Sequence, residues 1–355
     1  MSSKTWLRHY PAEVPPTYDY PKHNLAKILV RAASEYPERE ALYFFGKSIN
    51  YRRLLDEAYR FGNALSRLGV GKGDRVALML PNCPQMVIAY YGTLLIGGVA
   101  VMTNPLYTPR ELEFQLKDSG AIAIVTLDLL FKRVMKAAPA TDIRHVVVTS
   151  LKDYLPFPKN VLYPLKARID GLERDVTYGN GVVSFRELLK RSSASPCEAD
   201  VDADRDLALI QYTGGTTGRP KGVMLTHANL TANTVQCRLW CYRSRVAEET
   251  FLAALPFFHV FGLTVLLHQS VYLAGTLLLV PRFEAGQVLR LIAKRKPTIF
   301  PGAPTMYISL LNHPDIRRYD LSSIRFCISG AAPLPLDVQE RFERITGGKL
   351  IEGYG

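Results

Sequence analysis

Residues 210–227 read IQYTGGTTGRPKGVMLTH, and they contain a loop in which glycine, threonine and one lysine replace bulky side chains. The apolar pattern predicts strands at 207–213 and 222–227 on either side of it. Backbone N–H groups of glycine can approach an anion closely, and hydroxyls can bind phosphate oxygens or Mg²⁺. Lys221 adds a positive point charge. The loop therefore predicts a phosphate-binding site, and a flexible hairpin tip rich in Gly and Thr is the alternative.

Two familiar phosphate-binding motifs do not fit this chain. A Walker A loop needs Gly-Lys followed by Ser or Thr, but Arg219 and Pro220 separate Gly218 from Lys221. Another glycine-rich stretch, GVGKGD at 69–74, leads from a helix into a strand, whereas a dinucleotide loop leads from a strand into a helix. The sequence therefore predicts a phosphate loop of another kind after Thr213, and only a turn at 69–74.

Helical and strand patterns alternate on both sides of this loop. Such alternation is typical of parallel sheets that are covered by helices. Before the loop, the patterns predict helices at 51–68, 86–96 and 109–119 and strands at 75–80, 98–102 and 121–126. After it, they predict helices at 228–242, 262–273, 285–294 and 304–312 and strands at 250–256, 275–280, 298–304 and 324–330.

We therefore expect an α/β fold with two βα sheets in two subdomains. Residues 1–200 would form the first subdomain, with an N-terminal extension and a surface excursion, because residues 154–205 mix Pro, Gly and charge without a regular pattern. Residues 201–355 would form the second, which would contain the phosphate loop and a substrate pocket.

Charge and composition narrow the class of partner. The formal net charge is +12 and the sequence pI is about 9.4, a balance that suits nucleic acid, an anionic membrane surface or a polyanionic substrate. The basic residues are scattered, and no long basic run interleaves with aromatic residues as in single-strand binders. The pattern therefore predicts no nucleic-acid partner.

Cysteine usage and hydropathy bear on the compartment. The five cysteines are odd in number and widely spaced, which argues against a disulfide framework and for a reducing compartment. The N-terminus has no apolar signal-peptide core. Two uncharged stretches, 86–102 and 260–280, are broken by glycine, so each predicts a buried helix followed by a buried strand rather than a membrane span. We expect a cytoplasmic protein.

Motifs along nearly the whole chain resemble those of one family. YTGGTTGRPKG at 212–222 is similar to the signature of the AMP-forming acyl-CoA synthetases, which are adenylate-forming enzymes. Gly215 is a departure, because many relatives carry Ser there. The likeness is strongest to bacterial long-chain fatty-acid–CoA ligases. The other matching motifs follow in the family's order: GKGDRVALMLPN at 71–82, TNPLYTPRELEFQL at 103–116, PFFHVFGL at 256–263, PGAPTMY at 301–307, ISGAAPLP at 328–335 and EGYG at 352–355.

The resemblance implies a nucleotide site. Thr213, Thr216, Thr217 and Lys221 would contact the β- and γ-phosphates of ATP, with Thr216 and Thr217 beside Mg²⁺. Tyr354 would lie flat against the adenine ring. The catalytic residues would be His259 and Lys221. The full set of nucleotide-binding residues would be Thr213, Gly214, Gly215, Thr216, Thr217, Gly218, Lys221, Ser329, Gly330, Ala331, Ala332, Pro333, Glu352, Gly353, Tyr354 and Gly355.

An acyl pocket is expected beside the nucleotide. Between residues 251 and 314 the only carboxylate is Glu284, whereas an amino-acid substrate would bring an ammonium group that needs an acidic partner. An apolar acid is therefore favoured. A lone histidine beside phenylalanines is also typical of an ordinary packed core, so His259 owes its expected role to the resemblance. The acyl residues would be Phe257, Phe258, His259, Phe261, Gly262, Gly302 and Met306.

The resemblance also implies a reaction and its partners. A fatty acid and ATP would give acyl-adenylate and pyrophosphate, and the thiol of CoA would then take the acyl group and release AMP. The C-terminal lid domain of such enzymes would lie beyond this chain, so turnover by the chain alone is expected to be poor. Two alternatives are a non-catalytic nucleotide-binding fragment and a ligase for an aryl acid. A homodimer and peripheral contact of residues 154–168 with the inner membrane face are further expectations.

Overall fold

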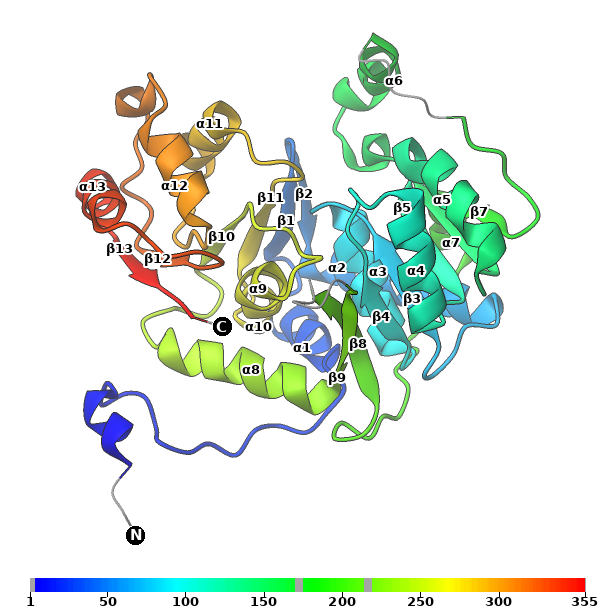
Figure 1. Cartoon of the computed structure of the whole chain (residues 1–355), viewed down its shortest axis with the longest axis horizontal. Helices are drawn as coiled ribbons and strands as arrows, with labels where there is room; N and C mark the ends of the chain where they lie inside the picture. The colour runs from blue at the N-terminus through cyan, green and yellow to red at the C-terminus, as the bar shows by residue number, and fades with distance from the viewer. Residues whose placement is uncertain (1–3, 170–174, 214–218, 355) are drawn as a thin grey trace.

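The computed structural model describes residues 4–169, 175–213 and 219–354 (Figure 1). Within these residues the strands form sheets of seven, four and two strands. The largest sheet has the order β7-β6-β5-β3-β4-β8-β9, in which only the last pair is antiparallel. Its strands are β3 (Arg75–Met79), β4 (Val99–Met102), β5 (Ala123–Leu127), β6 (His145–Thr149), β7 (Val182–Ser184), β8 (Leu207–Thr213) and β9 (Lys221–Thr226).

Helices cover both faces of the seven-stranded sheet. The α3 helix (Pro84–Leu95) is buried along its whole length and packs with α2 (Tyr51–Arg67) in the largest apolar core. On the other face, α4 (Pro109–Ser119) and α5 (Phe131–Ala137) contribute to a separate core. The central strands are buried on both faces, as parallel strands between helix layers are. The expected α/β fold and the buried helix and strand within 86–102 are confirmed.

A second sheet combines distant parts of the chain. Its order is β10-β11-β1-β2, in which β10 (Thr250–Ala253) and β11 (Thr276–Leu279) pair in parallel. The hairpin of β1 (Glu40–Phe44) and β2 (Lys47–Asn50) completes it, because β1 pairs in parallel with β11. The segment expected to be a helix and strand over 260–280 is a helical run, α9 (Val260–Gly262), a π-helical stretch (Leu263–His268) and α10 (Gln269–Tyr272), followed by β11.

A third, two-stranded sheet follows. Its parallel strands are β12 (Phe326–Ser329) and β13 (Lys349–Glu352). The predicted strand at 298–304 is present only as single bridges, which join Ile299 to both Phe251 and Phe326, and Gly302 to Ser329. Isolated bridges replace a ladder here because the segment passes between two sheets. The helices beside it are α11 (Ala285–Arg295), α12 (Pro304–Leu311) and α13 (Leu336–Thr346), which share an apolar core with both sheets.

The strand pairing crosses the expected boundary between subdomains. Strand β1 belongs to the first 200 residues but pairs with β11, and β8 and β9 lie after residue 200 but extend the seven-stranded sheet. The subdomains 1–200 and 201–355 stay a prediction, and the sheets do not divide at residue 200. The α8 helix (His227–Trp240) leads the chain from β9 toward the second sheet, and α1 (Lys27–Glu35) packs near it (Figure 1).

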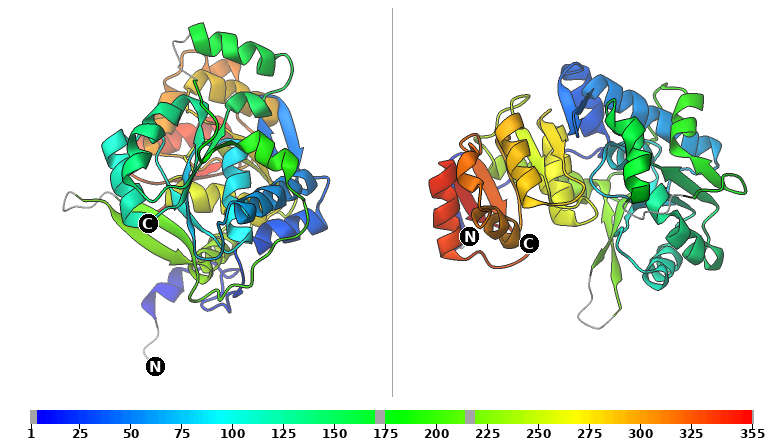
Figure 2. Two further views of the ribbon diagram at one scale, coloured as in Figure 1. Left: turned by 90° about the vertical axis from the view of Figure 1, so that its right-hand side faces the viewer. Right: turned by 90° about the horizontal axis from the view of Figure 1, so that it is seen from above.

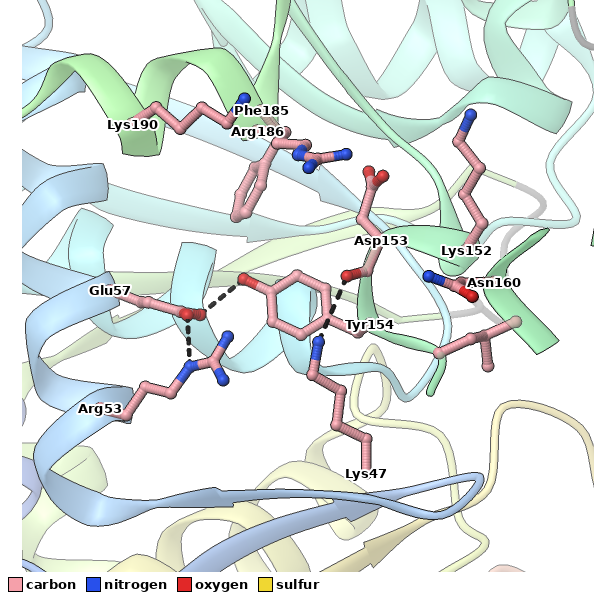
Figure 3. A pocket seen from close by; sticks show the side chains of 11 residues that line it. Lys47, Arg53, Glu57, Lys152, Asp153, Tyr154, Asn160, Phe185, Arg186 and Lys190 are labelled. Carbon is pink, nitrogen blue, oxygen red and sulfur yellow. Dashed lines mark hydrogen bonds and ion pairs between the residues drawn. The ribbon is translucent and has the colours of Figure 1, made fainter. Parts of the chain in front are cut away.

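The predicted surface excursion contains a helix. The α6 helix (Lys159–Ile169) stands at the periphery, away from the sheets (Figures 1 and 2). A 3-10 turn (Leu151–Tyr154) precedes it, and a hollow of about 550 Å³ opens between this turn, the β1–β2 hairpin, α2 and α7 (Phe185–Arg191) (Figure 3). Among the described residues, every helix lacks either the length or the apolarity that crossing a bilayer requires.

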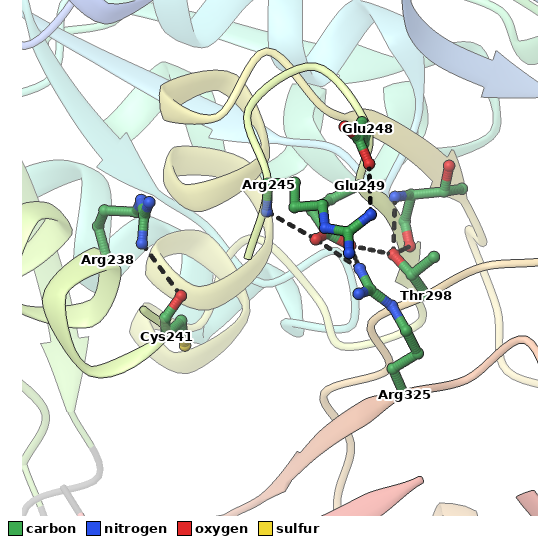
Figure 4. Close-up of polar contacts among 8 residues, drawn as sticks. Arg238, Cys241, Arg245, Glu248, Glu249, Thr298 and Arg325 are labelled. Atoms are coloured by element: carbon green, nitrogen blue, oxygen red, sulfur yellow. Dashed lines mark hydrogen bonds and ion pairs between the residues drawn. The ribbon is translucent and has the colours of Figure 1, made fainter. Parts of the chain in front are cut away.

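A buried carboxylate joins the second sheet to the third (Figure 4). The Glu249 side chain is buried and accepts two hydrogen bonds from Arg325, at 2.6 and 2.7 Å, and one from the Thr298 hydroxyl at 2.5 Å. Burial pushes the pKa of Glu249 up, but the hydrogen bonds from Thr298 and Arg325 outweigh it, so the pKa lies below its ordinary value. Thr298 directly precedes Ile299, and Arg325 directly precedes Phe326, which is bridged to Ile299. The Glu249 cluster therefore fixes the position of residue 299 between β10 and β12.

Candidate nucleotide and acyl site

Two paired strands form the neck of the phosphate loop. Thr213 ends β8, Lys221 begins β9, and the two residues are direct partners in the antiparallel pair. Lys221 is exposed, so its ammonium is available to an anion. The Tyr212 hydroxyl donates a 2.5 Å hydrogen bond to Asp118 and ties the base of the hairpin to α4. Of the residues expected to bind phosphate, Gly214, Gly215, Thr216, Thr217 and Gly218 lie outside the described residues.

A buried glutamine connects the phosphate loop to the segment PFFHVFGL at 256–263, which we call the aromatic loop. Gln211 lies two residues before Thr213, and its Nε2 donates a 2.9 Å hydrogen bond to the carbonyl of Phe258. The strand that carries the phosphate loop is therefore linked directly to the residue before His259. Sequence reasoning missed this residue, although a single polar residue inside the apolar run LALIQY is a usable signal.

A buried asparagine holds the other end of the aromatic loop. Asn82 follows β3, at the carboxyl edge of the seven-stranded sheet. Its Nδ2 donates to the carbonyls of Ala253 and Leu255 at 2.9 and 2.8 Å, and its Oδ1 accepts from the N–H of Phe257 at 2.9 Å. One side chain thus satisfies three backbone groups in the segment that leads to His259. Asn82 is not among the site residues predicted from the sequence.

His259 occupies an exposed position just before α9. Its Nδ1 accepts a 3.3 Å hydrogen bond from the N–H of Phe261 and so caps that short helix. An accepting Nδ1 leaves the proton of the neutral ring on Nε2, by inference from the hydrogen bond. The described residues place no hydrogen-bond partner on Nε2. His259 can therefore present an N–H donor to an anionic oxygen.

Three of the motifs meet at the third sheet. The N–H of Gly302 donates to Ile328 at 2.9 Å, the N–H of Gly330 donates back to Gly302 at 3.2 Å, and Gly353 donates to Ser329 at 2.7 Å. A Cβ added at Gly330 would lie 2.9 Å from the ring of Phe261, so this glycine allows the aromatic loop to pack against the strand end. The structure therefore brings Phe261 and Gly302 together with Ser329, Gly330 and Gly353, and their binding roles stay a prediction.

The end of β12 and the loop after it carry two signs of a binding surface. Ala331 has a φ of +71°, a left-handed conformation that is strained for alanine and is concentrated at functional sites. The Ser329 hydroxyl is buried, and none of the described residues offers it a hydrogen-bond partner. An unsatisfied buried hydroxyl costs about 1–3 kcal/mol unless a ligand or water completes it.

Most of the remaining residues expected to bind the nucleotide are exposed near the end of the two-stranded sheet. Ala331, Ala332 and Pro333 are exposed, and Tyr354 is fully exposed. Glu352 accepts a 2.9 Å hydrogen bond from the N–H of Leu334, which holds the loop against β13. Gly355 lies outside the described residues. The ring of Tyr354 is thus free to contact a planar ligand.

A small apolar cavity lies beside β10 and β12. Its volume is about 20 Å³, which is room for about one water molecule. The cavity is lined by Cys237, Cys241, Ser244, Phe251, Val265, Gln269, Leu273, Ile299, Pro301, Phe326 and Ile328. None of the seven expected acyl residues lines it: Phe257 and Gly262 are buried, while Phe258, Phe261 and Met306 are half-buried and pack against the apolar cores. Their assignment to the acyl chain stays a prediction.

The cavity walls are chemically inert. Burial raises the pKa of the Cys237 thiol to about 11 and that of Cys241 to about 12, so both are neutral near pH 7. All five cysteines are free. In the parts of the chain that the structure describes, no three His, Cys, Asp or Glu side chains come together as a metal site. Two wider hollows, of about 550 and 500 Å³, contain none of the expected site residues.

Comparison with known proteins identifies the class. Residues 29–355 match the family model of the AMP-binding enzymes, and the chain belongs to this family. It is 46% identical over 356 residues to a long-chain-fatty-acid–CoA ligase of Bacillus subtilis (strain 168), and the match covers 100% of this chain and 63% of that protein. The chain therefore spans about 63% of the length of this relative.

Solved structures agree with this placement. The crystal structure of a long-chain-fatty-acid–CoA ligase from Archaeoglobus fulgidus matches with a TM-score of 0.80 at 26% identity, covering 97% of this chain and 66% of that one. An anthranilate CoA ligase in complex with anthranoyl-AMP also reaches a TM-score of 0.80 at 26% identity, covering 94% of this chain and 60% of that one. The two neighbours share the fold and act on different acids, so the fold alone does not select the acid.

Proposed function

We propose that this chain is the ATP- and acyl-binding part of a fatty-acid–CoA ligase that forms AMP. The observation that carries the proposal is the hydrogen bond from Gln211 to Phe258, which couples the strand of the phosphate loop to the loop of His259. Family membership and the 46% identity to a long-chain-fatty-acid–CoA ligase support it. The proposed reaction uses a fatty acid, ATP and CoA, and it yields acyl-CoA, AMP and pyrophosphate.

The exposed cation and the histidine suit the two stages of this chemistry. In the first, a carboxylate oxygen attacks the α-phosphorus of ATP, and the bond to the departing pyrophosphate breaks. Lys221 and the loop amides would stabilise the charge on pyrophosphate, and the Nε2–H of His259 would donate to the carboxylate or the α-phosphate. In the second, the CoA thiolate attacks the acyl carbon, and the bond to AMP breaks.

Magnesium is part of the proposal. Thr216 and Thr217, the expected ligands, lie outside the described residues, and the described part of the chain offers no carboxylate cluster for a metal. We infer that Mg²⁺ would bind chiefly to phosphate oxygens, with hydroxyl and water ligands, which suits a small, hard cation. When bound, it would neutralise charge on the phosphates.

The nucleotide part of the proposal is tested by the phosphate loop. Replacing Lys221 and Thr216 together by alanine is expected to weaken ATP binding by about tenfold or more, because a charge and a hydroxyl donor to phosphate are lost. Titration calorimetry on the folded chain measures this. The control is Lys117→Ala, which removes an exposed lysine that pairs with Glu113 on α4. Unchanged ATP affinity in a folded double variant would contradict the proposal.

The acyl part is tested at Met306, one of the expected acyl residues, which is half-buried. Met306→Trp is expected to weaken binding of a long-chain fatty acid about tenfold, because the larger ring takes space from the chain, and to change little for a short acid that does not reach so far. Val246→Trp is the control, because Val246 is exposed and is not among the expected acyl residues. Fluorescent fatty-acid displacement gives both affinities. Tighter binding of an aromatic acid than of a fatty acid would favour the aryl-acid alternative.

Three further parts of the proposal concern the protein in the cell. We propose a cytoplasmic location, contact with the inner face of a membrane, and a homodimer. The free thiols support the cytoplasmic location. A fatty substrate supports contact with a membrane. A non-catalytic nucleotide-binding fragment is the remaining alternative, and ATP binding without adenylate formation by a full-length protein would favour it.

A further inference from the structure

The α6 helix exposes an apolar stripe to solvent. Val161, Leu165 and Ile169 recur every four residues, which places them along one side of the helix, and Leu162 lies beside them. Phe157 lies in the segment just before the helix begins at Lys159. All five side chains are more than half exposed, from 55% for Leu162 to 81% for Phe157. Soluble proteins seldom expose contiguous apolar surface without a binding role. This apolar stripe therefore needs a partner.

The charged residues of the segment that contains the stripe indicate the sign of the partner's charge. Residues 154–169 contain no carboxylate, but they contain three cations, Lys159, Lys166 and Arg168. The chain as a whole has a formal net charge of +12. A second copy of this chain would bring the same cations against these, so self-association through the stripe is disfavoured. An anionic partner is favoured.

A cationic hollow opens at the foot of α6 (Figure 3). Its volume is about 550 Å³, and Leu155 and Asn160 from the start of the excursion line it. Lys159 anchors the helix there by donating a 2.8 Å hydrogen bond to the carbonyl of Phe45. The charged side chains that line the hollow are Lys47, Arg53, Lys152, Arg186 and Lys190, against Glu57 and Asp153.

The cations of this hollow are only partly balanced. Arg53 pairs with Glu57 at 2.8 Å, and Lys190 pairs with Glu187 at 3.1 Å. Lys152 and Arg186 form no ion pair with any described residue. Burial lowers the pKa of Lys47, and Asn160 has a buried Oδ1 without a partner among the described residues. An anionic group in the hollow would relieve the unbalanced charge.

We propose that the apolar stripe and the cationic hollow together form a docking surface for an anionic phospholipid bilayer. The stripe would enter the boundary between headgroups and acyl chains, and Lys152 and Arg186 would bind headgroup phosphates. The proposal rests on the proposed function in one respect: a protein that acts on a fatty acid gains access to its substrate at a membrane, because fatty acids partition into lipid. It assigns the expected membrane contact to named residues.

Vesicle flotation tests the stripe. The chain is expected to float with vesicles that contain about one third phosphatidylglycerol and to stay unbound with pure phosphatidylcholine. Val161→Glu with Leu165→Glu should weaken binding to the anionic vesicles about tenfold or more, because two charges then face the acyl boundary. The matched control is Leu336→Glu with Ile345→Glu on α13, which changes the same charge at exposed apolar residues elsewhere.

The hollow is tested in the same assay. Lys152→Gln with Arg186→Gln should weaken binding to anionic vesicles several-fold and flatten its dependence on salt, since headgroup contacts are screened. Circular dichroism confirms folding of every variant, and calorimetry measures ATP affinity. The proposal is overturned if the chain does not bind anionic vesicles, or if the stripe variant binds as the unmodified chain does. It is also overturned if light scattering shows that the stripe variant converts a dimer into a monomer. Intact ATP binding in these cases would leave the proposed function standing.

Discussion

Asn82→Ala is expected to lower the free energy of unfolding by about 3–5 kcal/mol. The substitution leaves the carbonyl of Leu255 and the N–H of Phe257 buried without the partner they have in the fold, and each such group costs about 1–3 kcal/mol. The carbonyl of Ala253 loses one of its two hydrogen bonds and keeps the one from the N–H of Val280. It also leaves a small cavity under the loop. Urea unfolding followed by circular dichroism measures the change, provided that the transition is two-state.

A matched asparagine supplies the control. Asn63 also donates from Nδ2 to two backbone carbonyls, those of Ser193 and Ser195, but these groups are exposed and water can replace it. Asn63→Ala should therefore cost about 1 kcal/mol or less. Asn82→Asp should be nearly as damaging as the alanine variant, because a carboxylate can accept from Phe257 but cannot donate to the two carbonyls. Equal losses for Asn63→Ala and Asn82→Ala would show that the anchoring role is wrong.

Mild acid is expected to destabilise the chain through two buried histidines. His227 accepts a 3.0 Å hydrogen bond from the N–H of Leu25, and burial lowers its pKa to about 4. His268 hydrogen-bonds to the Tyr90 hydroxyl at 2.8 Å, and burial lowers its pKa to about 3. Each ring has one buried nitrogen without a partner in the described structure. Both are therefore held neutral in the fold.

The direction of the pH effect follows from proton linkage. In the unfolded chain a histidine has a pKa of about 6.5, so between that value and the folded pKa the unfolded state binds more protons. Stability is therefore lost as pH falls below about 6.5, down to about 4 for His227 and about 3 for His268. The loss should reach about 2 kcal/mol per histidine at pH 5, or about 4 kcal/mol together.

Urea unfolding at pH 7, 6 and 5 measures this loss. His227→Gln and His268→Gln should each remove about half of the pH dependence, whatever they do to stability at pH 7. His9→Gln is the control, because His9 is exposed in the N-terminal 3-10 helix. The same slope in all four proteins would mean that the buried histidines are not the cause.

The local patterns of the sequence predicted most of the elements well. The expected helix at 51–68 is Tyr51–Arg67, and the expected helix at 109–119 is Pro109–Ser119, which begins with a capping box between Thr108 and Glu111. Apolar spacing and caps act within one or two turns, so a single stretch of chain contains the whole signal. The phosphate loop was placed between two strands for the same reason.

Other features depended on distant residues. Pairing of β1 with β11 joins residues more than 230 positions apart, and the segment after Thr298 became single bridges because two sheets compete for it. The π-helical wall (Leu263–His268) of the apolar cavity also differs from the regular helix expected at 262–273. No local pattern specifies which edge a strand joins, since many edges offer the same backbone hydrogen bonds.

By itself, the sequence determined the α/β class, the order of helices and strands, and the motifs that place the chain among the AMP-binding enzymes. These depend on side-chain periodicity and on short runs of glycine, hydroxyl and charge. Only the tertiary structure decided that Asn82 and Gln211 hold the aromatic loop, that Phe261 packs on Gly330, and that the apolar stripe at α6 is exposed within the described residues. Those contacts arise between residues far apart in the chain, where burial leaves each polar group only the partner that folding brings to it.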